Sequence, residues 1–239
     1  MKIILLGYGK MGKEIEKIAL SRKHEIVYCI DMDNKYRLSE LIMGSADVAI
    51  EFTQPDAAYD NIRACLEKKI PVVSGTTGWL QRKGEVEAMV KKTEGAFFYA
   101  SNYSVGVNLF FHFNKIMAKM MNNFPGYEVE LEEIHHIYKK DAPSGTAITA
   151  AEGILENLDR KEKWILNREI ASKEELRIVD KRIAAVPGTH TIVYHSPVDS
   201  IELRHTAYNR EGFALGAVLA AEFLQGKSGL FGMHDMLGF

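Results

Sequence analysis

The sequence predicts an α/β protein in which an open parallel sheet is followed by an α+β domain. Two observations lead to this fold class. Over the first hundred residues, short apolar runs alternate with segments of helical spacing, which is typical of parallel strands joined by right-handed crossovers. After Val105, a long helical segment is followed by strands that alternate in period two, which favours a sheet with one covered face.

In the first half, each expected strand is a continuous apolar run of the kind that is buried on both faces of a sheet. The first helix begins near Met11, and its apolar residues recur at helical spacing. Pro55 and Asp56 are suited to opening the next helix. The expected strands are residues 2–6, 25–30, 47–52, 71–74 and 96–100, and the further helices are residues 56–68 and 80–92.

The second half mixes helices with alternating strands. Tyr127, Val129 and Leu131 alternate with polar residues, which predicts an antiparallel strand with one covered face. A charged loop is expected after Leu158, and the last helix is apolar enough to pack on a sheet, so it could return to the first domain. The expected elements are helix 107–121, strand 127–138, helix 144–158, strands 176–179, 191–194 and 200–208, and helix 213–224.

Composition and charge indicate an ordinary globular protein of the cytoplasm. Of 239 residues, 46% are hydrophobic and 26% are charged, and 30 basic against 32 acidic side chains give a net charge of -2. This balance argues against nucleic acid or an anionic membrane as the main partner. The cysteines, Cys29 and Cys65, form no disulfide framework or CxxC metal site. The uncharged segment 95–114 contains polar residues that are poor at facing lipid, so we interpret it as buried core.

The run Gly7-Tyr8-Gly9-Lys10-Met11-Gly12 is an intact G-x-G-x-x-G that directly follows an expected strand and opens a helix. Gly7 suits the tight turn, Gly9 lets the backbone approach a pyrophosphate, and Gly12 allows close packing of helix on strand. Asp31, at the end of the second strand, would accept hydrogen bonds from the ribose hydroxyls of adenosine. The alternative is a glycine turn without a ligand. The complete context predicts a Rossmann-type dinucleotide site.

Two further small-residue segments follow the fourth and fifth strands: Ser74-Gly75-Thr76-Thr77-Gly78 and Ala100-Ser101-Asn102-Tyr103-Ser104. Both lie at carboxyl ends of strands, the edge at which open α/β sheets bind ligands. Their backbone amides could reach the nicotinamide end of a cofactor. Ordinary turns between strand and helix are the equally open alternative.

The densest cluster of chemically active residues is the segment 133–147, Glu-Ile-His-His-Ile-Tyr-Lys-Lys-Asp-Ala-Pro-Ser-Gly-Thr-Ala. His135 and Lys139 could donate protons near neutral pH. The residues Ser144, Gly145 and Thr146 would offer amides and hydroxyls to an anion. A strand with surface lysines and a simple N-cap explains the same residues, and a metal site at the paired histidines lacks a well-placed third ligand. Composition alone leaves these alternatives open.

The motif E-x-H-H-x-x-K-x-D-A-P-S-G-T-A resembles the signature of the dihydrodipicolinate reductases (4-hydroxy-tetrahydrodipicolinate reductases) of the diaminopimelate and lysine pathway. The resemblance covers essentially the whole chain, from the glycine motif through Gly188 and His190 to residues 229–231. Ala184 and Pro187 depart from the common pattern, which puts only the shape of a loop in doubt.

The resemblance implies an NADH- or NADPH-dependent reductase of a cyclic dicarboxylate without a metal, in which hydride from the cofactor adds to the substrate ring. It implies a Rossmann-type domain of residues 1–102 and 210–239 and a substrate-binding and oligomerisation domain with a mixed sheet, residues 103–209, that assembles homotetramers. By the same resemblance, His135 and Lys139 are the catalytic residues. The substrate-binding positions are His136, Ser144, Gly145, Thr146 and Arg210, and the cofactor-binding positions are Gly7, Tyr8, Gly9, Lys10, Met11, Gly12, Asp31, Gly75, Thr76, Thr77, Ala100, Ser101, Asn102 and Tyr103.

The choice between the two cofactors depends on the residues after the second strand. Asp31 and Asp33 would bind a free ribose 2′-hydroxyl and repel a 2′-phosphate, whereas Lys35 and Arg37 could fold over and neutralise the phosphate. We therefore expect use of both cofactors with NADH favoured. Another Rossmann dehydrogenase would share the first half, but it would not need His-His-x-x-Lys followed by Ser-Gly-Thr. A non-catalytic regulator that senses the cofactor would need a nucleic-acid module, and a net charge of -2 without a spare basic helix counts against it.

Overall fold

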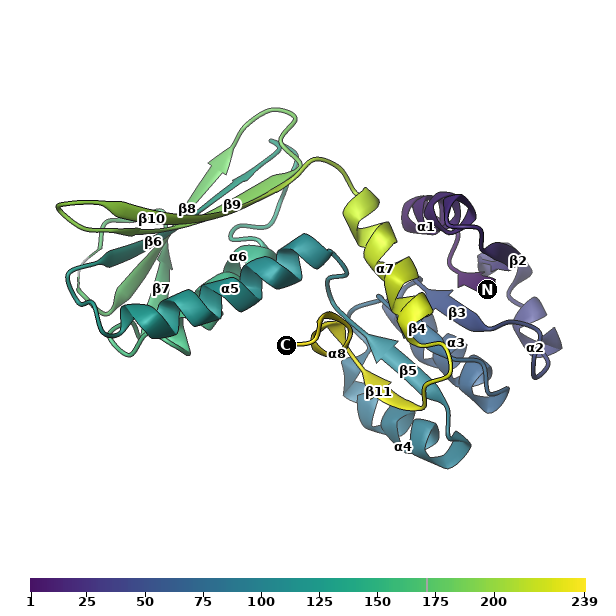
Figure 1. The fold of residues 1–239 in the computed structure, drawn as a ribbon. Helices are drawn as coiled ribbons and strands as arrows, with labels where there is room; N and C mark the ends of the chain where they lie inside the picture. The colour runs from purple at the N-terminus through teal and green to yellow at the C-terminus, as the bar shows by residue number, and fades with distance from the viewer. Residues whose placement is uncertain (171) are drawn as a thin grey trace. The chain divides into compact units, whose positions relative to one another are not determined.

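The computed structural model describes residues 1–170 and 172–239, and its chain forms two units (Figure 1). Unit 1 contains Met1–Val105 and Arg210–Phe239, and unit 2 contains Gly106–Asn209. Residues 103–105 thus group with unit 1, although the sequence analysis placed the boundary after residue 102. Each unit has its own sheet and is described by itself.

A six-stranded sheet forms the centre of unit 1. Its strands are β1 (Lys2–Leu6), β2 (Glu25–Ile30), β3 (Val48–Glu51), β4 (Val72–Ser74), β5 (Ala96–Tyr99) and β11 (Gly229–Phe231). They lie in the order β11-β5-β4-β3-β1-β2, and all neighbouring pairs are parallel. The expected open parallel sheet is confirmed. The short strand β11 was not predicted, because only its pairing with the distant β5 identifies it.

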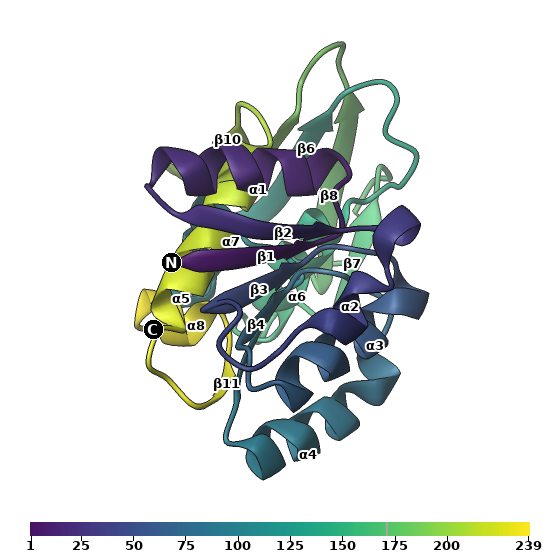
Figure 2. The ribbon, with the colours of Figure 1, turned by 90° about the vertical axis from the view of Figure 1, so that its right-hand side faces the viewer.

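Helices cover both faces of this sheet. They are α1 (Lys10–Ser21), α2 (Arg37–Glu40), α3 (Pro55–Glu67), α4 (Lys83–Thr93), α7 (Glu211–Phe223) and α8 (Met233–Leu237), with the 3-10 turns η1 (Met32–Asn34) and η2 (Leu80–Arg82). Ile3 and Leu5 pack with α1 and α7, whereas Ile4 and Leu6 pack with α3 and α4. Figure 2 shows the sheet between α1 and the α3–α4 pair. The last long helix does return to the first unit, as expected, and η2 occupies the first turn of the helix expected over 80–92.

The turn between β1 and α1 requires glycine at two positions. Gly7 has a φ of +89°, a conformation that side chains disfavour, and a Cβ there would lie 2.1 Å from the carbonyl oxygen of Phe52. A Cβ at Gly12 would lie 2.3 Å from the carbonyl oxygen of Gly7. The helix therefore starts in close contact with the end of the strand, as the glycine motif predicts.

Unit 2 contains a mixed five-stranded sheet. Its strands are β6 (Glu128–His135), β7 (Lys163–Leu166), β8 (Glu175–Arg182), β9 (Gly188–His195) and β10 (Ser200–Ala207), in the order β10-β9-β6-β8-β7. Strand β6 pairs antiparallel with β9, as its alternation predicts, and parallel with β8. The prediction of a charged loop after Leu158 was wrong at β7, where Trp164 and Ile165 join the sheet through β8. Strand β6 ends at His135, before the expected Tyr138, because the following residues form the loop to the next helix.

Two helices, α5 (Val105–Met121) and α6 (Gly145–Leu155), cover one face of this sheet (Figure 1). Val129 and Leu131 of β6 point into their core together with Ile178, Ile192 and Tyr194. The alternation of β6 therefore carries Glu133 and His135 onto the same covered face. No helix in the described part of the chain is both long and apolar enough to cross a membrane.

Candidate functional site

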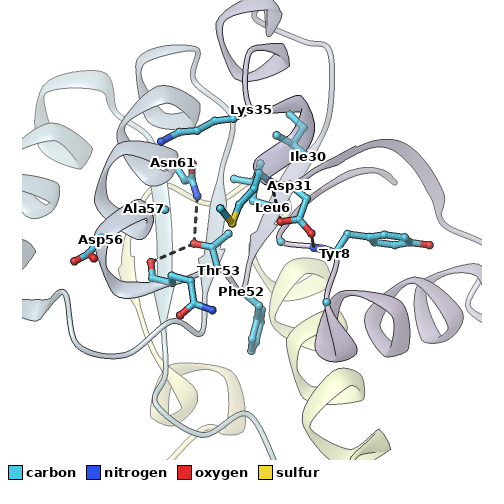
Figure 3. A pocket seen from close by; sticks show the side chains of 14 residues that line it. Leu6, Tyr8, Ile30, Asp31, Lys35, Phe52, Thr53, Asp56, Ala57 and Asn61 are labelled. Atoms are coloured by element: carbon cyan, nitrogen blue, oxygen red, sulfur yellow. Dashed lines mark hydrogen bonds between the residues drawn. The ribbon is translucent and has the colours of Figure 1, made fainter.

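The strand order of unit 1 creates a ligand-binding position at the carboxyl ends of β1 and β3. The chain runs from β1 to β2 on one side and then crosses to β3 on the other, so the connections leave the sheet in opposite directions at this point. Open α/β sheets bind ligands at such switch points. A pocket of about 480 Å³ opens here, lined by Leu6, Gly7, Tyr8, Gly9, Ile30, Asp31, Met32, Lys35, Phe52, Thr53, Gln54, Asp56, Ala57 and Asn61 (Figure 3).

One wall of the pocket consists of the predicted glycine turn and Asp31. The backbone N–H of Tyr8 donates to Asp31 Oδ2 at 3.1 Å, and the N–H of Met32 donates to Oδ1 at 2.8 Å. These two bonds hold an exposed carboxylate beside the glycine turn, where a ribose would lie if a pyrophosphate bound the start of α1. Gly9 is the N-cap of α1 and has open space where a Cβ would be. Figure 3 shows the ring of Tyr8 directed away from the pocket.

The opposite wall was missed by the sequence analysis. Phe52, Thr53 and Asn61 follow or lie close to the end of β3, and Asn61 donates to Thr53 Oγ1 at 3.2 Å (Figure 3). Strand β3 was predicted, but its place beside β1 depends on the order of strands, which no local pattern reveals. Lys35 also lines the pocket, whereas Arg37 is not among the lining residues.

A fully buried carboxylate, Glu51, organises the wall that follows β3. Its Oε1 accepts bonds from the N–H of Thr53 at 3.0 Å, from the Thr53 hydroxyl, and from the hydroxyl of Thr76 at 2.7 Å. Its Oε2 accepts a bond from Ser74 Oγ at 2.6 Å. The carboxylate thus ties the loop after β4 to the pocket residue Thr53.

The remaining residues predicted to bind the cofactor do not line this pocket. Lys10, Met11 and Gly12 belong to the first turn of α1, and Gly75, Thr76 and Thr77 follow β4. The segment Ala100–Tyr103 follows β5, with Ser101 exposed and Asn102 half-buried. Tyr103 is a core residue: its hydroxyl donates to the carbonyl of Ser74 at 2.7 Å, and its ring packs on Phe52. Its buried side chain offers a ligand no surface.

In unit 2, the predicted catalytic residues lie at and after the end of β6. His135 is buried, His136 is half-buried, and Lys139 donates to both carboxylate oxygens of Asp141 at 2.7 and 2.8 Å. This contact holds the pKa of the Asp141 carboxyl below its usual range. Arg182 donates to the carbonyl of Asp141 at 2.8 Å, which anchors the loop to β8. The loop then passes through a cis Ala142–Pro143 bond to α6.

Glu133 is the buried acid at the centre of this region. Its Oε1 accepts the backbone N–H of Ser144 at 2.8 Å, and its Oε2 lies 3.2 Å from His135 Nδ1 and 3.5 Å from His190 Nε2. Burial alone would raise the pKa of the Glu133 carboxyl, but the contacts with His135, His190 and Ser144 outweigh it and hold that pKa well below its usual range. Burial lowers the pKa of His190, although the contact with Glu133 acts in the opposite direction. The lowered pKa favours the neutral form of His190.

Glu133, His135 and His190 form a group with the composition of a possible metal site. Ligand-type atoms of Glu133, His135 and His190 lie within 4.8 Å of one another, so the third group that the sequence analysis did not find is Glu133, and the second histidine is His190 in place of His136. The spacing would admit an ion. It is also the spacing at which a carboxylate orients a histidine by direct contact.

The predicted substrate residues divide between the two units. Ser144 is the N-cap of α6: its hydroxyl accepts the N–H of Ala147 and lies 3.1 Å from His190 Nε2. Helix geometry leaves the amides of Gly145 and Thr146 without an intrahelical partner, which suits them to bind an anion. Arg210, in contrast, is an exposed residue of unit 1 at the start of α7.

Comparisons with known proteins agree over the whole chain. Family models described as "Dihydrodipicolinate reductase, N-terminus" and "C-terminus" match residues 1–103 and 106–237. A 4-hydroxy-tetrahydrodipicolinate reductase of Christiangramia forsetii is 50% identical over 99% of this chain and 98% of its own, and one of Methanococcus vannielii is 35% identical over 98% and 82%. A solved dipicolinate-bound dihydrodipicolinate reductase from Paenisporosarcina sp. TG-14 has the same fold, with a TM-score of 0.79, 22% identity and 98% of each chain covered. The chain belongs to the dihydrodipicolinate reductase family.

Proposed function

We propose that this chain reduces 4-hydroxy-tetrahydrodipicolinate to tetrahydrodipicolinate with NADH or NADPH, a step of diaminopimelate and lysine biosynthesis. The observation that carries the proposal is the arrangement after β6, where His135, Lys139 and the start of α6 follow one another in the signature order of the family. Net reduction adds one hydride and one proton to the substrate and releases water. The cofactor supplies the hydride, and the protein must supply the proton and hold the anion.

The pocket between β1 and β3 supports binding of the cofactor. Gly9 leaves the start of α1 open to a pyrophosphate, Gly7 allows the tight turn before it, and Asp31 is held in place to accept bonds from a ribose. Glu51 would act indirectly, because it fixes Thr53 and the loop after β4. In this proposal the further contacts of residues 75–77 and 100–102 are made toward the nicotinamide end.

The loop after β6 and the start of α6 would bind and protonate the substrate. The amides of Gly145 and Thr146, together with His136, are suited to a carboxylate of a cyclic dicarboxylate. His135 and Lys139 are the groups that would deliver the proton. Arg210 of unit 1 stays a proposed substrate-binding residue on the match to the family's pattern alone. Cytoplasmic location and assembly to a homotetramer complete the proposal, and analytical ultracentrifugation would test the assembly.

The direct test is oxidation of NADH on addition of freshly generated 4-hydroxy-tetrahydrodipicolinate. Turnover that depends on this substrate supports the proposed function. Turnover with an amino acid or a semialdehyde, and none with this substrate, would identify a different dehydrogenase. Binding of NADH without turnover of any of these compounds would favour a cofactor sensor.

Removing either proposed proton donor should slow turnover. His135→Ala and Lys139→Ala are expected to lower kcat by about a hundredfold or more, the usual contribution of a general acid, with little change in NADH affinity. The measurement is steady-state kinetics beside an NADH fluorescence titration. His195→Ala and Lys140→Ala, at exposed positions, serve as matched controls. Wild-type turnover in both test variants would refute the assignment.

The proposed anion site should recognise two carboxylates. Pyridine-2,6-dicarboxylate is expected to inhibit competitively against the substrate, and pyridine-2-carboxylate to inhibit much more weakly, because it lacks the second anionic group. Inhibition constants for both compounds under the same conditions provide the comparison. Equal inhibition would mean that the site does not read the second carboxylate.

Disturbing the buried Glu51 network should weaken cofactor binding. In Glu51→Gln, an NH₂ group replaces one acceptor oxygen among hydroxyl and amide donors, so Thr53 and the loop after β4 would no longer be held in place for the cofactor. A loss of about 1.4 kcal/mol of binding free energy would raise the Kd for NADH about tenfold. A fluorescence titration measures this Kd, with the exposed Glu67→Gln as a control for the charge change. An unchanged Kd would show that the network does not support the pocket.

Cofactor preference should depend on the charges beside Asp31. We expect both cofactors to be used with NADH favoured, and the kcat/KM for NADPH to gain on that for NADH as salt screens the acids. Since Lys35 lines the pocket and Arg37 does not, Lys35→Ala should lower kcat/KM for NADPH alone, by about fivefold, the effect of one exposed ion pair. Arg37→Ala is the matched control. A clear NADPH preference unaffected by Lys35→Ala would contradict this account.

A further inference from the structure

We propose that Glu133 is a positioning residue of the reaction: its buried carboxylate holds the Nδ1–H tautomer of His135, so that Nε2 carries the transferred proton. The inference rests on the proposed function, in which His135 delivers a proton to the substrate. It assigns a role to Glu133, to which the sequence analysis gave none beyond its place as the first residue of the motif E-x-H-H-x-x-K.

The fold brings the three groups together through strand register. Glu133 and His135 are two residues apart on β6, so both side chains point to the face covered by α5 and α6. His190 is the cross-strand partner of Glu133 in the β6–β9 ladder. All three side chains are buried, which removes water as a competing partner.

The two oxygens of Glu133 have different tasks. Oε1 accepts the N–H of Ser144 and thereby fixes the start of α6. Oε2 lies 3.2 Å from His135 Nδ1, within ion-pair distance, and neither atom makes a hydrogen bond in the described part of the chain. A buried carboxylate and a buried ring nitrogen would each be costly if left unsatisfied, so each is the partner that the other requires.

A carboxylate in this position determines which ring nitrogen carries the labile proton. With Nδ1–H directed at Glu133, the other nitrogen, Nε2, is the one that exchanges protons with the substrate. The chain keeps space beside that nitrogen: a Cβ at Gly188 would lie only 3.1 Å from His135 Nε2. Glycine at this position therefore keeps a side chain away from Nε2.

The test is Glu133→Gln in the full-length protein. The amide keeps an oxygen for the N–H of Ser144, but its NH₂ group would donate to His135 Nδ1 and favour the Nε2–H tautomer without a compensating charge. We expect kcat to fall by about a hundredfold, while KM and the Kd for NADH change by less than about threefold. Glu133→Asp, which retains the charge, should recover part of the activity.

Nitrogen-15 NMR of the histidine rings supplies a readout that does not depend on activity. His135, assigned by comparison with His135→Ala, should be the Nδ1–H tautomer in the wild type. Glu132→Gln is the matched control, because this neighbour points to the other face of the sheet and pairs with Lys181. Its kinetics and spectrum should match those of the wild type.

Several results would overturn the inference. These are a wild-type kcat in Glu133→Gln, an Nε2–H tautomer of His135 in the wild type, and activity that EDTA removes and Zn²⁺ restores. Should Glu133→Gln fail to fold, the tautomer of the wild type still decides the question. An inactive wild-type protein would instead contradict the proposed function, whereas an active one with an equally active Glu133→Gln variant contradicts only the role of Glu133.

Discussion

Burial of the Glu133 carboxylate is the constraint on which the geometry of the unit 2 site depends. A buried charge needs polar partners in place of water, and those of Glu133 come from three separate elements: the Ser144 amide at the start of α6 donates to it, and the rings of His135 on β6 and His190 on β9 lie within 3.5 Å. The contacts of this one carboxylate therefore connect the end of β6, the neighbouring strand β9 and the start of α6. The proposed proton donor and the proposed anion site are consequences of the same requirement.

Unit 1 also contains a buried carboxylate, Glu51, that is surrounded by polar groups. This carboxylate also lies at the carboxyl end of a buried strand, and Ser74, Thr53 and Thr76 satisfy it. Parallel strands bring their polar ends to one edge, where loops must be held without regular ladder bonds. A buried acid with several hydroxyl and amide donors gives such loops a defined arrangement, since each unsatisfied donor would be costly.

Local patterns in the sequence predicted the fold more completely than they predicted which residues line the two candidate sites. Most strands, the glycine turn and the return of the last helix follow from apolar runs and spacing, because those features are set by near neighbours, whereas β7 was missed within a charged segment. Strand β11, the pocket residue Phe52 and the contact between Glu133 and His190 depend on which strands pair, and no local pattern carries that information. The side chain of Tyr103 lies in the core, which its position in a motif does not reveal, so only its backbone remains available for the predicted cofactor contact.

The ion pair between Lys139 and Asp141 is weak enough for the proposed proton donor, Lys139, to exchange one partner for another. Both oxygens of Asp141 accept bonds from the ammonium group, and the Asp141 side chain is 61% exposed whereas that of Lys139 is 19% exposed. An exposed partner makes the pair worth no more than about 1 kcal/mol, since water solvates the carboxylate that leaves. In the proposed reaction, a substrate carboxylate that also accepted bonds from the amides of Gly145 and Thr146 would therefore displace Asp141 at little cost. The pair would hold the Lys139 ammonium group before the substrate binds and free it afterwards.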